Sequence, residues 1–317
     1  MCSPERLVFK KMPTFASIIN KVYTYMTTTD IKLALTLPKR LAIFGCITIV
    51  GFFLTTVVAY LITLKFGGDS TPAMRIAAIL QDVLLLIMPA IATALLVTRR
   101  PADLLALRVA SPRRLCLMAV LAAVTLVVST PAMNVVIAWN EALPLPEGLA
   151  AAMLEMEQSA AAALSVIQGH GGVGDIIVAV FVMGVAAGFA EELFFRGAFQ
   201  RLLVTGRVNV HVAVWVVGIV FSLIHMQFYG FVPRMLLGVY FGYLLVWSGT
   251  VWLPIIIHAL NNTLYVLNAR LAGEDSALES VGTGDTAVWA VVSVVATVAL
   301  LYVLSRVCRG RCRAVSA

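Results

Sequence analysis

The sequence predicts an all-α, polytopic membrane protein of about eight transmembrane helices. Three observations predict this fold class: an apolar composition, apolar runs of membrane-spanning length, and basic residues that alternate between loops. Of the 317 residues, 61% are hydrophobic and 12% are charged, whereas soluble domains are about 45 to 50% apolar and about 25% charged. Runs of about 20 apolar residues fit a hydrocarbon core of roughly 30 Å. One helical domain is therefore expected.

Eight apolar runs follow one another along the chain. They lie at about residues 41–64, 76–97, 115–138, 176–202, 211–230, 232–248, 251–269 and 287–306. The predicted organisation is a basic N-terminal lead-in (1–40), three transmembrane helices (41–140), an extracytosolic loop (141–175), a core that carries the polar motifs (176–270), and a last transmembrane helix with a basic cytosolic tail (271–317). An Ala-rich stretch at 149–164 is expected to form an interfacial helix.

The loops alternate in charge as the positive-inside rule requires. Lys and Arg concentrate before the first run, in 98–114, in 201–207 and in the tail, whereas the loops between them are acidic. Both termini are therefore predicted to be cytosolic. This topology explains the net charge of +7 without a nucleic-acid partner. The chain is expected to be a multi-pass integral membrane protein, in the cell (inner) membrane if it is bacterial.

Ionisable residues inside the apolar runs are informative, because each costs at least about 2.5 to 3.5 kcal/mol at a helix centre unless it is paired or hydrated. The fourth run contains Glu191, Glu192 and Arg196. Glu192 and Arg196 are spaced i, i+4 and can form an ion pair on one helix face. Glu191 lies about 100° around the helix and is left free for another role.

Two later runs carry further polar groups. His225 lies in the fifth run, while His258 and Asn262 share one face of the seventh at i, i+4 spacing. These groups and the glutamates are candidates for one buried pocket. Two glycine pairs form small-xxx-small faces that allow close helix approach near that pocket: Gly184 with Gly188, and Gly238 with Gly242.

The motifs Glu-Glu-x-x-x-Arg, Phe-x-x-x-His and His-x-x-x-Asn occur in this order on three runs. Together they resemble the CPBP family, which comprises type II CAAX prenyl endopeptidases and Abi-like bacteriocin-processing or immunity relatives. The resemblance covers about residues 176–265. The sequences around Phe195-Arg196-Gly197 and Trp252-Leu253-Pro254 are also similar.

The resemblance implies an intramembrane endopeptidase with a cavity open to the cytosol. It implies that Glu191 is the general base that activates water, that His225 helps to bind or polarise the water, and that Glu192 and Arg196 brace the base. His258 and Asn262 would donate hydrogen bonds to the oxyanion, at about 2.7 to 4 kcal/mol per donor. The expected substrate is a membrane-associated or lipid-modified peptide or protein in the lipid bilayer.

Metal dependence stays open, with no cofactor favoured. Zinc is the alternative, and Glu191, Glu192, His225 and His258 would be its ligands. The His-Glu-x-x-His spacing of many zinc peptidases is absent, and relatives of this kind also resemble glutamate-type peptidases.

Two other function classes are alternatives to a peptidase. One is a non-catalytic scaffold of the bacteriocin-immunity type, and the other is a membrane transporter, although the internal repeat typical of transporters is not found. Asp82, Arg234 and His211 match no motif and are interpreted as packing or interfacial residues. Polar residues can also serve only to hold helices together.

Overall fold

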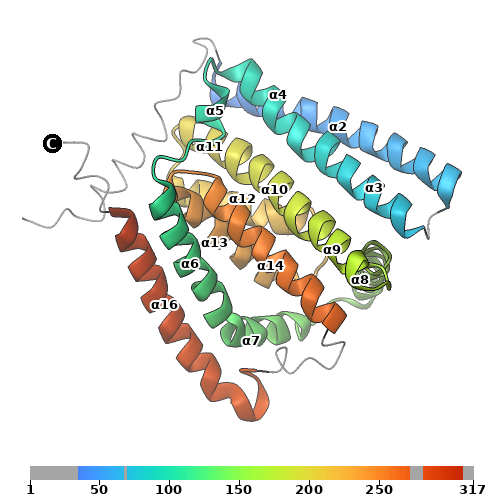
Figure 1. Cartoon of the computed structure of the whole chain (residues 1–317), viewed down its shortest axis with the longest axis vertical. Helices are drawn as coiled ribbons and strands as arrows, with labels where there is room; N and C mark the ends of the chain where they lie inside the picture. The colour runs from blue at the N-terminus through green and yellow to red at the C-terminus, as the bar shows by residue number, and fades with distance from the viewer. Residues whose placement is uncertain (1–34, 68–69, 272–280, 310–317) are drawn as a thin grey trace, which may run out of the picture.

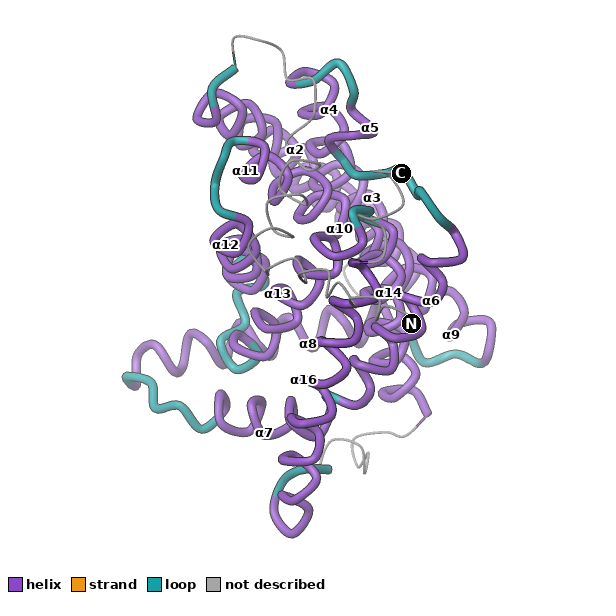
Figure 2. Tube along the Cα trace, turned by 90° about the vertical axis from the view of Figure 1, so that its left-hand side faces the viewer, coloured by secondary structure: helices purple, strands orange, loops and turns teal. Residues whose placement is uncertain are grey.

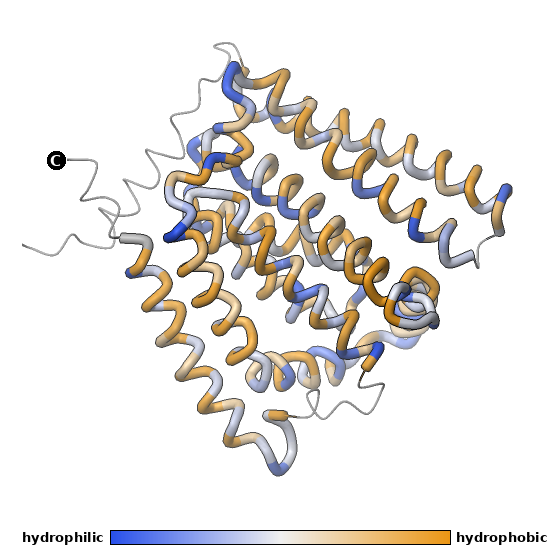
Figure 3. Tube along the Cα trace, in the orientation of Figure 1, coloured by the Kyte–Doolittle hydropathy of each residue, from blue (hydrophilic) through white to orange (hydrophobic). Residues whose placement is uncertain are grey.

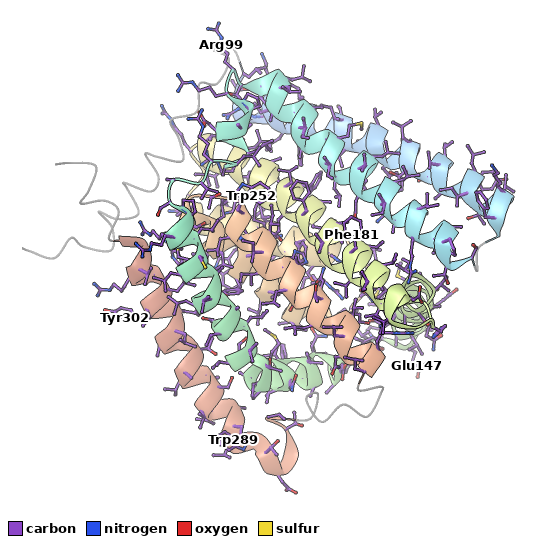
Figure 4. The ribbon with its side chains drawn as sticks, in the orientation of Figure 1. Arg99, Glu147, Phe181, Trp252, Trp289 and Tyr302 are labelled. Atoms are coloured by element: carbon purple, nitrogen blue, oxygen red, sulfur yellow. The ribbon has the colours of Figure 1, made fainter. Side chains whose placement is uncertain are left out.

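The computed structural model describes residues 35–67, 70–271 and 281–309, which form helices joined by turns and loops, without a β-strand (Figures 1 and 2). This confirms the all-α fold class. Arg99, from a loop predicted to be basic, and Glu147, from the predicted extracytosolic loop, lie at opposite ends of the molecule (Figure 4). Which end faces the cytosol stays a prediction. Most of the predicted lead-in and the end of the predicted tail lie outside the described residues.

The first two spans pack side by side (Figure 1). The first is α2 (Leu37–Phe66). The second runs without interruption through α3 (Thr71–Gln81), the π-helical turn η1 (Asp82–Ile87) and α4 (Met88–Val97). The π-helical turn ends beside Pro89, which has no N–H to donate to the α-helical hydrogen-bond ladder. A π-helical turn of this kind frequently lies at a functional site.

The third predicted run is bent instead of straight. After the short helix α5 (Pro101–Leu104), helices α6 (Pro112–Val128) and α7 (Thr130–Glu141) meet at 49°. Pro131 lies in the first turn of α7, where its missing N–H and its ring disfavour continuation of α6. The predicted run at 115–138 is therefore helical, with a bend within it.

The predicted interfacial segment is a helix, α8 (Glu147–Gln168), and it is longer than the Ala-rich stretch. It packs against α3 and α9. None of its residues is fully buried. Its position at a membrane surface stays a prediction.

The centre of the molecule is one continuous helical span and the helices around it (Figure 1). The span comprises α9 (Val173–Ala179), η2 (Val180–Ala186), α10 (Ala187–Glu192), η3 (Leu193–Gln200) and α11 (Arg201–Thr205). The helices that follow are α12 (Val210–Leu223), α13 (Phe231–Ser248), α14 (Trp252–Leu271), the short η4 (Gly284–Thr286) and α16 (Ala287–Arg309).

The predicted run 211–230 is only partly helical. Helix α12 ends at Leu223, and Met226 has a positive φ of 54°, which places it in a turn. Asn140 of α7 binds this turn through hydrogen bonds to the carbonyls of Phe228 and Tyr229. His225 therefore lies in a turn that packing from another helix holds, and not inside a membrane-spanning helix as predicted.

Helices lie on all eight predicted runs, and they differ in how well each could cross a bilayer. In the described residues, five are long and apolar enough, and the bent α6–α7 pair would add a sixth. Helix α12 has 14 residues, about 21 Å of rise. Helix α16 consists largely of hydrophobic residues along its length (Figure 3), and more than half of the surface of Trp289 and of Tyr302 is exposed. The chain is a multi-pass integral membrane protein.

Candidate functional site

Close contact between α10 and α14 positions the site. A Cβ atom added at Gly188 would lie 2.9 Å from the backbone N of Ala259, and one at Gly184 would lie 2.7 Å from Oγ1 of Thr263. Only glycine allows the two backbones to come this close. The first predicted glycine face is therefore confirmed, and it brings Glu191 and Glu192 on α10 close to His258 on α14.

The second glycine pair lies on α13 and contacts α12. A Cβ atom at Gly238 would lie 3.1 Å from the Cα of Gly218, and one at Gly242 would lie 2.9 Å from Cγ1 of Val214. This confirms the second small-residue face. It also brings the end of α12 and the following turn beside the site.

Glu192 and Arg196 form the predicted ion pair. Nη1 of Arg196 donates to Oε1 of Glu192 at 2.6 Å, and both side chains are fully buried. Nη2 of Arg196 donates to the carbonyl of Gly238 at 2.9 Å. The guanidinium also lies 4.7 Å from the ring centre of Phe221. Arg196 thus links two parts of the molecule. One is the span that carries the glutamates, and the other is α13 with the aromatic side chains beside it.

His258 lies between the two glutamates. Its Nδ1 atom is 2.8 Å from Oε1 of Glu192, and its Nε2 atom is 3.7 Å from Oε2 of Glu191. Because an ionised carboxylate can only accept, Nδ1 donates the hydrogen bond to Glu192. The ring stacks on Phe241 with 4.6 Å between centres. Two contacts therefore fix the imidazole and turn Nε2 towards Glu191.

Glu191 is the carboxylate that its neighbours leave available. Its side chain is 18% exposed, whereas that of Glu192 is 0% exposed. Oε2 of Glu191 is buried and has no hydrogen-bond partner among the described residues. The different roles predicted for the two adjacent glutamates thus correspond to two different environments.

His225 approaches the site across an aromatic side chain. Its Nδ1 atom lies 2.8 Å from the carbonyl oxygen of Phe221. The ring of Phe221 lies 5.1 Å from the His225 ring and 5.8 Å from the His258 ring, measured between centres. The charges of His225 and Glu191 are close enough to influence each other. Phe221, the first residue of the second motif, therefore separates the two imidazoles.

Asn262 is held by its neighbours on α14 and η2. Its Nδ2 atom donates to the carbonyl of Met183 at 3.2 Å, and its Oδ1 atom accepts from Asn261 at 3.2 Å. Of the six predicted site residues, Glu191, Glu192, Arg196 and His258 form one contact chain. His225 lies beside it, and Asn262 binds the opposite backbone instead of a member of the chain.

Two ionisable residues near the site do not belong to the motifs. Asp82 is 7% exposed and begins η1, which packs against α10. Asp82 and Arg234 both lie within reach of the Glu191 charge. Both are predicted from sequence to be packing or interfacial residues. The signal that marks them is the cost of an ionisable side chain inside an apolar run.

The donor set does not fit a metal ion in this arrangement. In residues 35–67, 70–271 and 281–309, no three His, Cys, Asp or Glu side chains come together in a way that could hold a metal. Oε1 of Glu192 already accepts from Arg196 and His258.

The fold and site define a polytopic helical membrane protein with a buried cluster of carboxylates and imidazoles. The family model described as type II CAAX prenyl endopeptidase Rce1-like matches residues 173–264. That segment contains all six predicted site residues, and the match confirms the resemblance found in the sequence. Comparisons with curated proteins and with solved structures give no match.

Proposed function

We propose that the chain is an intramembrane endopeptidase that hydrolyses a peptide bond with water activated by Glu191. The observation that carries the proposal is the contrast within the glutamate pair. Glu192 is fully buried and bound to Arg196 and His258. Glu191 directs an unpartnered oxygen towards Nε2 of His258 across 3.7 Å, which is too long for a hydrogen bond. Both atoms remain free to bind a third group.

In the proposed mechanism Oε2 of Glu191 binds a water molecule, and Nε2 of His258 binds the carbonyl oxygen of the substrate. Glu191 takes a proton from the water as the oxygen attacks the scissile carbonyl, and it returns the proton to the leaving amine. His225 helps to bind the water through its second ring nitrogen. A general base positioned in this way typically raises the rate by about 10²- to 10⁴-fold.

The oxyanion is stabilised by donors from α14. Asn262 donates from Nδ2, and His258 with a proton on both ring nitrogens donates from Nε2, to the negative oxygen that forms on the carbonyl carbon. Asn262 exchanges its bond to the Met183 carbonyl for this one. Glu192 and Arg196 act indirectly, because they fix the position of the His258 ring. The proposed substrate is a membrane-associated or lipid-modified peptide or protein, of which prenylated CAAX proteins are one candidate.

The test is cleavage of prenylated and unprenylated membrane peptides by the purified full chain, with and without a chelator. The Glu191→Gln variant is expected to lose at least about 100-fold in kcat. Its matched control is Glu155→Gln, an exposed carboxylate on α8, which is expected to behave like the wild type.

Chelator-resistant cleavage would support the glutamate mechanism, whereas loss of activity that zinc restores would support a metal site. Wild-type activity in Glu191→Gln would overturn the proposal. A non-catalytic scaffold would likewise keep its cellular effect after this substitution, and it would cleave no peptide.

A further inference from the structure

A chain of polar side chains connects the turn after α12 to α8. Nη2 of Arg234, in the first turn of α13, donates to Oε1 of Gln227 at 2.8 Å. Nε2 of Gln227 donates in turn to Oε1 of Glu157 at 3.2 Å. Gln227 therefore lies between the cation and the anion. Arg234 and Glu157 form no direct ion pair in the described part of the chain.

This arrangement leaves one donor of Arg234 without a partner. Nη1 of Arg234 is buried, and no described residue accepts a hydrogen bond from it. A buried, unpaired donor on a charged group costs more than the roughly 1 to 3 kcal/mol typical of a neutral one. Such an atom in a folded protein calls for a ligand or another explanation.

The unpaired donor belongs to a residue beside the proposed active site. Gln227, which Arg234 binds, lies in the same turn as His225, two residues further along the chain. Gly230 lies against the guanidinium, because a Cβ atom added there would be 3.0 Å from Nη2 of Arg234. Gln227 thus binds Nη2 and Gly230 packs against the guanidinium, while the edge at Nη1 keeps its hydrogen-bonding capacity.

We propose that Arg234 binds a carboxylate of the peptide substrate through this free edge. A guanidinium presents a planar set of donors that matches a carboxylate, and the pair is strongest where water is excluded. The inference rests on the proposed peptidase function and extends it to substrate choice. Two sources have this chemistry: the C-terminal carboxylate of the peptide, and an Asp or Glu side chain near the scissile bond.

Four versions of one membrane peptide distinguish the two sources. The C-terminus is either a free acid or an amide, and one residue near the cleavage site is either Glu or Gln. The wild type is expected to prefer the version with the recognised carboxylate about tenfold or more in kcat/KM, since a hydrogen bond to a charged group contributes about 1.5 to 3 kcal/mol.

The Arg234→Gln variant is expected to lose that preference, mostly through a higher KM for the charged peptide, and its rate on the neutral peptide serves as the reference for any general loss of activity. Arg234→Lys is expected to restore part of the preference. The control is Arg108→Gln, whose side chain is 72% exposed. An unchanged preference in Arg234→Gln, no preference in the wild type, or an equal loss on all four peptides would overturn the proposal and leave Arg234 a structural role.

Binding of the same peptides to Glu191→Gln separates this inference from the proposed function. The charged version is expected to bind Glu191→Gln at least about tenfold more tightly than the neutral version, and to lose this advantage when Arg234→Gln is added. This result does not depend on cleavage. If the wild type cleaves none of the peptides but the charged peptide still binds more tightly than the neutral one, the result therefore counts against the peptidase mechanism alone.

Discussion

Glu192 binds His258 by a hydrogen bond of 2.8 Å between Oε1 and Nδ1, and the same oxygen accepts from Arg196 at 2.6 Å. One fully buried carboxylate thus neutralises a guanidinium on its own span and orients an imidazole on α14. The hydrogen bond that one ring nitrogen makes determines whether the other ring nitrogen carries a proton. Glu192 therefore influences the protonation of Nε2 of His258, the atom that faces Glu191.

The first prediction concerns this shared oxygen. Glu192→Ala leaves the Arg196 charge buried without a partner, so it is expected to lower the free energy of unfolding by about 3 to 5 kcal/mol. Replacement of both residues, as Glu192→Met with Arg196→Met, is expected to cost less than the sum of the single changes, because no charge is left unpaired. Denaturation in mild detergent measures Glu192→Ala, the two single Met variants and the double Met variant. If the double change costs the sum of the two single changes in unfolding free energy, Glu192 and Arg196 are not coupled.

The second prediction concerns the α10–α14 contact. Gly188→Ala places a methyl group 2.9 Å from the backbone N of Ala259, and the resulting overpacking is expected to cost about 1 to 3 kcal/mol. It should also lower peptidase activity, because it separates Glu191 from His258. The control is Gly45→Ala in α2, where a Cβ atom meets nothing within 4 Å.

Gly45→Ala is expected to be neutral, or to stabilise the protein by up to about 1 kcal/mol through helix propensity. Thermal unfolding and the rate of cleavage are measured for both variants. Equal behaviour of the two would show that close approach of α10 to α14 is not required.

Local sequence features are sufficient to predict much of this site. The ion pair of Glu192 with Arg196 follows from i, i+4 spacing, and the glycine faces follow from four-residue spacing, because both depend on the geometry of one helix. The bond between Glu192 and His258 joins residues 66 positions apart. Nothing in the local pattern specifies it, since it depends on how α10 and α14 pack.

Continuity of an apolar run is a weaker guide. The run 211–230 predicts one helix, yet α12 ends at Leu223 and leaves His225 in a turn. Hydropathy cannot detect that end, because the turn is itself rich in apolar residues and its backbone groups are bound by Asn140 from α7. The bend before α7 is easier to predict from the sequence, because Pro131 marks it.

The third prediction concerns Asn140, which is fully buried. Its side chain accepts from the N–H of Val232 at 2.8 Å in addition to its two bonds to the preceding turn. Asn140→Ala is expected to destabilise the protein by about 1 to 3 kcal/mol or more, because buried backbone groups lose their partners. Activity is expected to fall with it, since the turn carries His225.

The neighbouring exposed residue provides the control for Asn140→Ala. Glu141→Gln at the end of α7 is expected to leave both stability and activity unchanged. Hydrogen exchange across residues 224–232 is the measurement that isolates the turn. Faster exchange in Asn140→Ala confined to this segment is the expected result, and unchanged exchange would contradict the assigned role.

The last prediction decides between two roles for Asn262. If it donates to the oxyanion, Asn262→Ala is expected to lower kcat about 10²- to 10³-fold with little change in KM, because the contact forms only in the transition state. If it serves only to hold the Met183 carbonyl, the same change is expected to lower stability while kcat stays within a few-fold of the wild type.

Asn261→Ala, which removes only the donor to Oδ1 of Asn262, is the matched control. Its expected loss in kcat is less than about tenfold, since it weakens the orientation of Asn262 and leaves the donor in place. Parallel measurements of kcat, KM and the unfolding temperature on all three proteins separate the two roles, because a catalytic contact and a structural one change different quantities.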